Sequence, residues 1–149
     1  MTKAQQIHEE TTILLIDDEP RNLRMMVKFL EGEGFEVLIA RDGKSGYQRA
    51  IYARPDLILL DAILPDTNGF EICRQLKTNL ETAQIPVLFL TVLTVPADWQ
   101  RAISSGAADY ITKPVQWEEL LLRIRTQIRI LHLERELAEV KAQLARMNG

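Results

Sequence analysis

The sequence predicts an α/β fold in which a parallel sheet carries helices on both faces. Short apolar runs without polar alternation, such as residues 13–16 and 57–60, are typical of strands buried on both faces. Amphipathic helical stretches separate successive runs, as βαβ crossovers require. This alternation repeats five times between residue 12 and about residue 116, so we expect a three-layer, doubly wound, five-stranded sheet.

The first part of the alternation contains two strand–helix units. Strand 12–16 precedes a helix that Pro20 begins and that Gly32 and Gly34 end, because proline suits the first turn of a helix and glycine its end. Strand 36–40 precedes a second helix over about 44–53, where apolar residues again recur at helical spacing. Each unit therefore supplies one strand and one crossover.

The second part of the alternation contains three further strands, at 57–60, 87–90 and 109–111. A third helix is expected after Asn68-Gly69, where the apolar residues Phe70, Ile72, Cys73 and Leu76 recur at helical spacing. A fourth helix is expected over 96–105, where it begins at a proline and ends before a glycine. These elements complete a sheet of five strands.

Composition limits the class of protein and its surroundings. A chain of 149 residues corresponds to about one domain, and residues 1–11 form a polar lead-in that we expect to be flexible. The net charge of −3 argues against direct nucleic-acid binding. The single cysteine, Cys73, excludes an internal disulfide and is expected in the core. No apolar segment approaches the roughly 20 residues of a membrane span, so we expect a cytoplasmic protein without a membrane partner.

The segment from about 115 to 147 contains neither glycine nor proline and is expected to form one long helix. It carries two successive apolar stripes, offset by about 100° around the helix. The first stripe is expected to pack on the sheet and consists of Trp117, Leu121, Ile124, Ile128 and Leu131. The second stripe, the seam, consists of Ile130, Leu133, Leu137, Val140, Leu144 and Met147.

The seam has the spacing of a and d positions in a coiled coil. In a parallel dimer, Arg129 would face Glu134 and Glu136 would face Lys141, both attractive pairs. We therefore expect residues 126–149 to form a helical extension that makes a parallel homodimer. The alternative is a solvated helix that packs only on its own domain.

Charged residues end three of the expected strands. Asp17 and Asp18 follow the first strand, Asp61 follows the third, and Lys113 follows the fifth. Because the carboxyl ends of parallel strands meet at one edge of the sheet, these side chains are expected to converge there. Three carboxylates and one lysine suit a divalent cation together with a phosphoryl group.

Four segments together resemble the receiver domain of two-component response regulators. They are ILLIDDEP (13–20), LILLDAILPDTNGFEICRQL (57–76), LFLT (88–91) and YITKP (110–114), in the order and spacing of that family. The resemblance covers about residues 12–125 and implies a flavodoxin-like (βα)5 fold with strand order 2-1-3-4-5.

The resemblance also implies the roles of the site residues. Asp61 would accept a phosphoryl group from a sensor histidine kinase or a histidine phosphotransfer protein. Asp18 and Asp61 would bind Mg²⁺ or Mn²⁺ directly, Asp17 through water, and Ile63 through its backbone carbonyl. Lys113 would contact the phosphoryl group. Such a protein is a signalling switch that catalyses only its own phosphorylation and dephosphorylation.

Two further residues are implied to sense phosphorylation. The hydroxyl of Thr91, at the end of the fourth strand, would turn toward the phosphoryl group. The ring of Tyr110 would then occupy the space that Thr91 leaves. This exchange would remodel the face formed by the fourth helix, the fifth strand and the fifth helix.

The chain also departs from the family pattern. Val92 stands where the family usually has a small residue, and this should narrow access to Asp61. Ile63 and Leu93 are apolar at positions from which polar groups could orient an attacking water, so we expect a long-lived acyl phosphate.

Two other functions are compatible with parts of this pattern. Because Val92 should narrow access to Asp61, one alternative function is a receiver-like dimerisation or interaction module that does not depend on phosphorylation. A phosphohydrolase with an aspartyl nucleophile would need a second carboxylate at position 63, where this chain has isoleucine.

Overall fold

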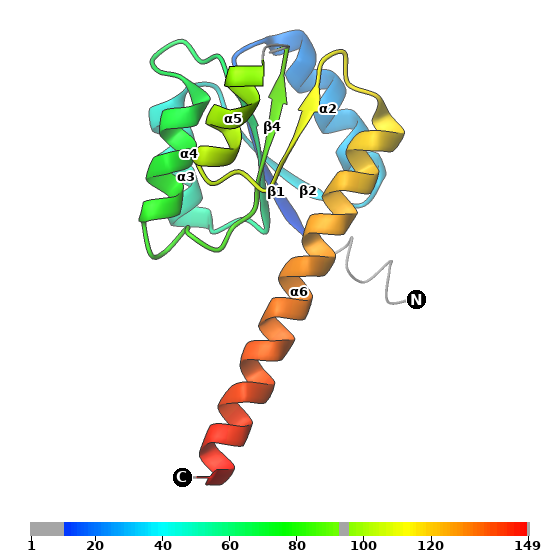
Figure 1. The fold of residues 1–149 in the computed structure, drawn as a ribbon. Coiled ribbons are helices and arrows are strands. Elements are labelled where there is room, and N and C mark those ends of the chain that lie inside the picture. The colour runs from blue at the N-terminus through cyan, green and yellow to red at the C-terminus, as the bar shows by residue number, and fades with distance from the viewer. Residues whose placement is uncertain (1–10, 93–95, 149) are drawn as a thin grey trace.

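The computed structural model describes residues 11–92 and 96–148, so position 93 and most of the lead-in lie outside the described residues. It contains a five-stranded parallel sheet in the order β2-β1-β3-β4-β5, which confirms the expected fold (Figure 1). The strands are β1 (Thr12–Ile16), β2 (Glu36–Ala40), β3 (Leu57–Asp61), β4 (Val87–Thr91) and β5 (Asp109–Thr112). The helices are α2 (Pro20–Gly32), α3 (Gly43–Ala53), α4 (Gly69–Thr78), α5 (Pro96–Ser104) and α6 (Trp117–Asn148).

The central strands β1, β3 and β4 are buried on both faces, as their continuous apolar runs predict. Strand β2 differs because it lies at the edge of the sheet, and its Ile39 remains 38% exposed. An edge position leaves one side of a strand without a neighbour.

Alternate residues of each central strand enter opposite core layers. Leu14 and Ile16 pack with α3, α4 and α5 on one face of the sheet, whereas Ile13 and Leu15 pack with α2 and α6 on the other. Figure 1 shows these two groups of helices on opposite sides of the sheet. The two cores hold the strands rigidly, so the residues at the strand ends have fixed positions.

The N-terminal part of α6 covers the second face of the sheet. Its buried residues are Leu120, Ile124, Ile128 and Leu131, and Trp117 and Leu121 pack partly buried against the same core. Leu120 is fully buried although the expected stripe omitted it. The contact face is wider than one stripe, because an amphipathic helix buries an arc of at least about 100°.

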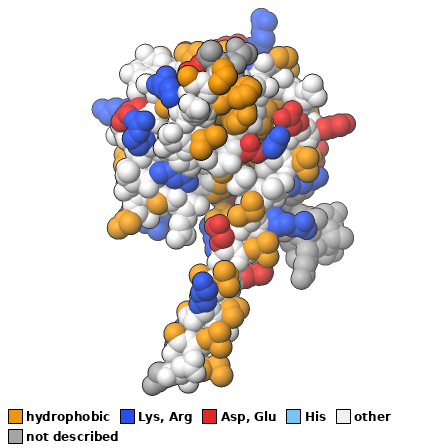
Figure 2. All heavy atoms as spheres, viewed as in Figure 1, with side chains coloured by type: hydrophobic (Ala, Val, Ile, Leu, Met, Phe, Trp, Pro, Cys, Tyr) orange, Lys and Arg blue, Asp and Glu red, His pale blue; other side chains and the backbone are white. Residues whose placement is uncertain are grey.

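Beyond this contact α6 leaves the domain and extends as a single helix (Figure 1). Apolar side chains line part of its protruding surface (Figure 2). The seam residues are exposed by 41–80%: Ile130, Leu133, Leu137, Val140, Leu144 and Met147. Ile130 precedes the buried Leu131 and lines a cavity against the domain, whereas the other five residues lie beyond the contact. Within the described ranges, none of the helices is both long and apolar enough to cross a membrane.

Candidate functional site

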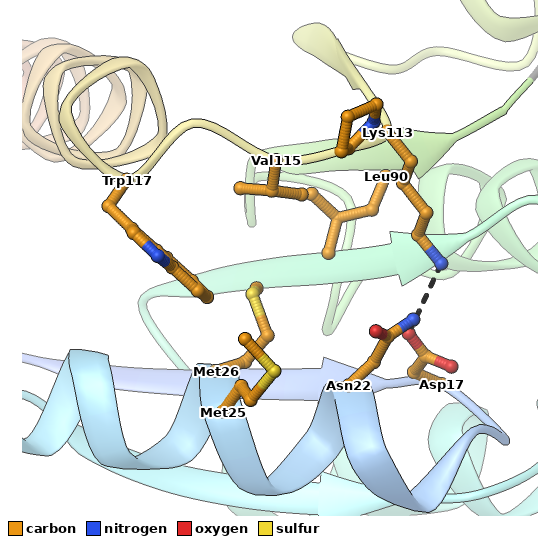
Figure 3. A pocket seen from close by; sticks show the side chains of 9 residues that line it. Asp17, Asn22, Met25, Met26, Leu90, Lys113, Val115 and Trp117 are labelled. Atoms are coloured by element: carbon orange, nitrogen blue, oxygen red, sulfur yellow. Dashed lines mark hydrogen bonds and ion pairs between the residues drawn. The ribbon is translucent and has the colours of Figure 1, made fainter.

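The carboxyl ends of β1, β3 and β5 bring three of the expected site residues together. The Lys113 ammonium nitrogen lies 3.0 Å from Asp61 Oδ2 and 3.5 Å from Asp17 Oδ2. Figure 3 shows Lys113 reaching across this edge toward Asp17. The Asp17 residue is almost completely buried, with 1% of its surface exposed. A positive charge therefore bridges two carboxylates at the predicted edge.

Burial and the neighbouring charges shift the pKa values of Asp17 and Lys113 in opposite directions. Burial raises the pKa of Asp17, although the Glu19 amide and the Lys113 ammonium partly offset this rise. Burial alone would lower the pKa of Lys113, but its hydrogen bond to Asp61 and the two nearby carboxylates raise it overall. Lys113 consequently remains an ammonium group at neutral pH.

Asp18 takes a different position from its neighbour. It is solvent-exposed, and its backbone carbonyl accepts a hydrogen bond of 3.4 Å from the Arg41 guanidinium. Among the described residues, no group of three or more acidic, histidine or cysteine side chains lies close enough to hold a metal ion. The structure thus joins Asp17 and Asp61 but does not gather all three carboxylates.

The donor chemistry nevertheless fits Mg²⁺. Asp17 is a buried carboxylate with a raised pKa, and a second carboxylate, Asp61, shares the same lysine. A hard divalent cation favours such oxygen ligands and would relieve the cost of burying the charge of Asp17. Asp18 directly follows Asp17, and Ile63 lies two residues after Asp61, so their oxygens would be the further ligands that the family resemblance implies.

The loop from β3 to α4 carries Ile63 and is closed by backbone contacts. The Ile63 amide donates to Asp61 Oδ1 at 3.0 Å, and the Gly69 amide donates to the Ala62 carbonyl at 2.8 Å. Ile63 also forms an antiparallel bridge with Asn68. A side chain at Gly69 would collide with the Asp61 carbonyl, so glycine permits this close approach. The loop is therefore held against the Asp61 carboxylate.

The two expected switch residues lie beside the same narrow space. Thr91 is the last residue of β4 and is 4% exposed, and the partly buried Tyr110 lines this space with it. The Tyr110 ring stacks on the Trp99 ring at a centroid distance of 5.4 Å. Val92, the next residue after β4, is 57% exposed at the surface. The structure thus brings Thr91 and Tyr110 together.

A cavity of about 210 Å³ opens beside the charged site, between α2 and the segment that links β5 to α6 (Figure 3). Asp17 and Lys113 lie at one end, and Met25, Met26 and Trp117 supply apolar walls. The charged edge is consequently next to an apolar surface.

Sequence reasoning missed three residues near the site. Arg41 contacts the backbone of Asp18, Trp99 stacks on Tyr110, and Asp66 binds the first amides of α3. The charged residues of the site were located because they follow an apolar run that predicts a strand. Trp99 and Asp66 do not have that position in the sequence. Asp66 does lie in a segment rich in turn-forming residues, Pro65 to Gly69, and this composition is the sequence feature that could have indicated its role.

Comparisons with known proteins agree with this geometry. The family model described as "Response regulator receiver domain" matches residues 13–125. The DNA-binding dual master transcriptional regulator RpaA of Synechocystis sp. is 44% identical over 117 residues, which are 78% of this chain and 48% of RpaA. The response regulator PleD of Caulobacter vibrioides is 37% identical over 135 residues, 91% of this chain and 30% of PleD. The chain thus spans about half or less of the length of these curated relatives.

Solved structures give the same result. A CheY-like receiver domain protein from Methanospirillum hungatei has a TM-score of 0.79 and 27% identity, over 83% of this chain and 98% of that protein. The receiver domain of a Pseudomonas aeruginosa sensor histidine kinase was solved with magnesium in its active-site cleft. It has a TM-score of 0.75 and 28% identity, over 79% of this chain and 97% of that domain. With its sheet order, its strand-end charges and these matches, the chain belongs to the response regulator receiver family.

Proposed function

We propose that this chain accepts a phosphoryl group on Asp61 from a histidine kinase or a histidine phosphotransfer protein, in a reaction that requires Mg²⁺. The observation that carries the proposal is the Lys113 ammonium 3.0 Å from Asp61 Oδ2, at the carboxyl edge of the sheet and beside the buried Asp17. Membership in the receiver family and the magnesium in the related Pseudomonas domain support it.

Asp61 performs the chemistry as a nucleophile. A carboxylate oxygen forms a bond to phosphorus while the bond from phosphorus to the donor imidazole nitrogen breaks, and the imidazole keeps the electron pair. The Lys113 ammonium faces the oxygens on which negative charge is spread. Asp17, Asp18, Asp61 and the Ile63 carbonyl would hold Mg²⁺, which supplies charge neutralisation when bound.

Phosphorylation by a small donor tests the acceptor directly. With Mg²⁺ and acetyl phosphate, the intact mass of the wild-type chain should increase by one phosphoryl group, and Asp61→Asn should show no increase. Asp56→Asn is the matched control, because Asp56 directly precedes the same strand at its opposite end. A full mass increase in Asp61→Asn, or none in the wild type, would contradict the proposal.

Thr91 and Tyr110 are proposed to sense the phosphoryl group. Phosphorylation adds about −1.5 to −2 charges and three acceptor oxygens beside the end of β4. The Thr91 hydroxyl can donate to one of these oxygens, and Tyr110 lines the space that a rotating Thr91 would leave. Because Tyr110 stacks on Trp99, any movement of the tyrosine ring also changes the contacts of α5.

Thr91→Ala should separate phosphorylation from this response. We expect the variant to gain the phosphoryl group while losing the change in Trp99 fluorescence, because the hydroxyl that couples the two is absent. Fluorescence must be recorded in a Trp117→Phe background, so that Trp99 is the remaining tryptophan of the two in the chain. Thr91→Ser restores the hydroxyl and serves as the control. An unchanged fluorescence response in Thr91→Ala would exclude the switch role.

We further propose that residues 126–149 mediate a parallel homodimer. Five of the six seam residues, from Leu133 onward, are exposed by 51–80% on the part of α6 that has left the domain, so their apolar surface is available to a second copy. The charges flanking the seam favour the parallel arrangement, since Arg129 would meet Glu134 and Glu136 would meet Lys141 across the interface. Each exposed pair contributes only about 0.2–1 kcal/mol, so the pairs select orientation.

A further inference from the structure

The tip of the β3–α4 loop is attached to a helix that is distant in sequence. Asp66 Oδ1 accepts a hydrogen bond of 2.8 Å from the Gly43 amide, and Asp66 Oδ2 accepts one of 3.0 Å from the Lys44 amide. These are the first two amides of α3. A single carboxylate therefore joins the loop to the start of this helix.

The remaining amides of this helix start are satisfied without Asp66. The Asp42 side chain accepts from the Ser45 amide at 2.7 Å, and the Asp42 carbonyl accepts from the Gly46 amide at 3.0 Å. Asp42 is thus the N-cap of α3, and Asp66 accepts from the two amides that this cap leaves free. The Gly43 amide, followed by that of Lys44, lowers the pKa of Asp66, which is consequently ionised at neutral pH.

Helix α3 is a rigid point of attachment. Gly46 lies directly against the side chain of Ile16 in β1, where an added Cβ would collide with it. At Gly43 an added Cβ would likewise meet Thr67 and Ile72, so the loop and α4 pack closely on the helix start. Asp66 therefore connects the loop to an element that is fixed on the central sheet.

The other end of the loop leads to the proposed metal site. Ile63 is held by the hydrogen bond that its amide donates to Asp61 Oδ1 and by its bridge to Asn68, and Asp66 lies between Ile63 and Asn68 in the chain. With both ends of the loop and its tip attached, the backbone of Ile63 has little freedom to rotate. The carbonyl of this residue is the backbone ligand proposed above for Mg²⁺.

We propose that Asp66 is a positioning residue that orients the Ile63 carbonyl for Mg²⁺ by tying the β3–α4 loop to the start of α3. This inference rests on the proposed metal site and names a residue that acts on it from outside. Residues that orient metal ligands typically change metal affinity by about 10–100-fold when they are replaced.

Calorimetric titration with Mg²⁺ alone tests the proposal on the full chain. We expect Asp66→Ala to raise the Kd for Mg²⁺ about tenfold. Asp66→Asn should raise it less, because the amide oxygen still accepts one of the two hydrogen bonds. Amide hydrogen exchange over residues 63–68 without Mg²⁺ should be faster in Asp66→Ala than in the wild type.

Asp42→Ala is the matched control, because it weakens the same helix start without touching the loop. We expect its Kd for Mg²⁺ to stay within about twofold of the wild type. Equal increases in Kd for Asp42→Ala and Asp66→Ala would show that Asp66 acts only as a cap of α3, and this result would overturn the inference. An unchanged Kd in Asp66→Ala would also overturn it. A wild-type chain that does not bind Mg²⁺ would instead remove the proposed metal site itself.

Discussion

Replacement of Lys113 by methionine is expected to slow phosphoryl transfer to Asp61 by at least about 100-fold, the usual cost of removing a preorganised group that stabilises charge in the transition state. Methionine keeps most of the apolar stem but removes the ammonium 3.0 Å from Asp61 Oδ2. The measurement is the rate of mass increase with acetyl phosphate and saturating Mg²⁺.

Lys113→Arg separates charge from shape in this experiment. Arginine keeps the positive charge but replaces a compact ammonium by a planar guanidinium, so we expect a rate between those of the wild type and Lys113→Met. Equal rates in the wild type and Lys113→Met would show that the lysine serves only to pair the carboxylates.

The same variant should change the dependence of stability on pH. The folded-state pKa of Asp17 already lies above its ordinary value, chiefly because of burial, and the nearby Lys113 charge opposes this rise. Without the lysine the pKa of Asp17 rises further, and its ionised form costs folding free energy above that pKa. Lys113→Met should therefore be less stable than the wild type at pH 7, by about 3 kcal/mol.

This difference should decrease as the pH falls through the raised pKa of Asp17, because protonation then removes the unpaired buried charge. Denaturant unfolding at several pH values, without Mg²⁺, measures it. A loss of stability that stays constant from pH 7 to acidic pH would point to lost packing of the lysine stem.

The strand-end signal explains why most of the site was predictable. An apolar run locates a strand, and the first polar residue after it locates the edge, so Asp17, Asp61 and Lys113 were found from sequence alone. The strands β3 and β4 each extend one residue beyond the apolar run, which places Asp61 and Thr91 within the sheet. Their backbone pairing with neighbouring strands is not visible in hydrophobicity.

Contacts between distant segments were not predictable in the same way. Asp66 meets α3 across 23 positions of sequence, and only the packed β3–α4 loop brings the two together. The exposure of Asp18 depends on the path of the β1–α2 loop. The half-exposed face of β2 depends on its position at the sheet edge, which the order of strands decides and the apolar pattern of a single strand does not.

Replacement of Leu137 by glutamate is expected to raise the dissociation constant of the proposed α6 homodimer by at least about 100-fold. Leu137 is 54% exposed in the single chain and occupies a central a position of the seam. In a parallel dimer the two copies of this residue would face each other, so the substitution places two carboxylates together in an apolar interface. Loss of a buried leucine alone typically costs about 2–5 kcal/mol. Light scattering over a range of protein concentrations measures the effect.

Ala142→Glu is the matched control, because it adds the same charge at an exposed f position on the outer side of the seam. It should leave the dissociation constant within about threefold, whereas equal weakening by both variants would indicate general charge repulsion.

Both variants should be measured with Mg²⁺, in the presence and absence of beryllofluoride as a mimic of the acyl phosphate. A dimer that forms only with beryllofluoride would tie the seam to Asp61. A seam-dependent dimer under both conditions would make α6 a constant scaffold, through which phosphorylation acts by rearranging the two helices. A wild-type chain that is monomeric under both conditions would exclude the dimer and leave the seam to a different partner.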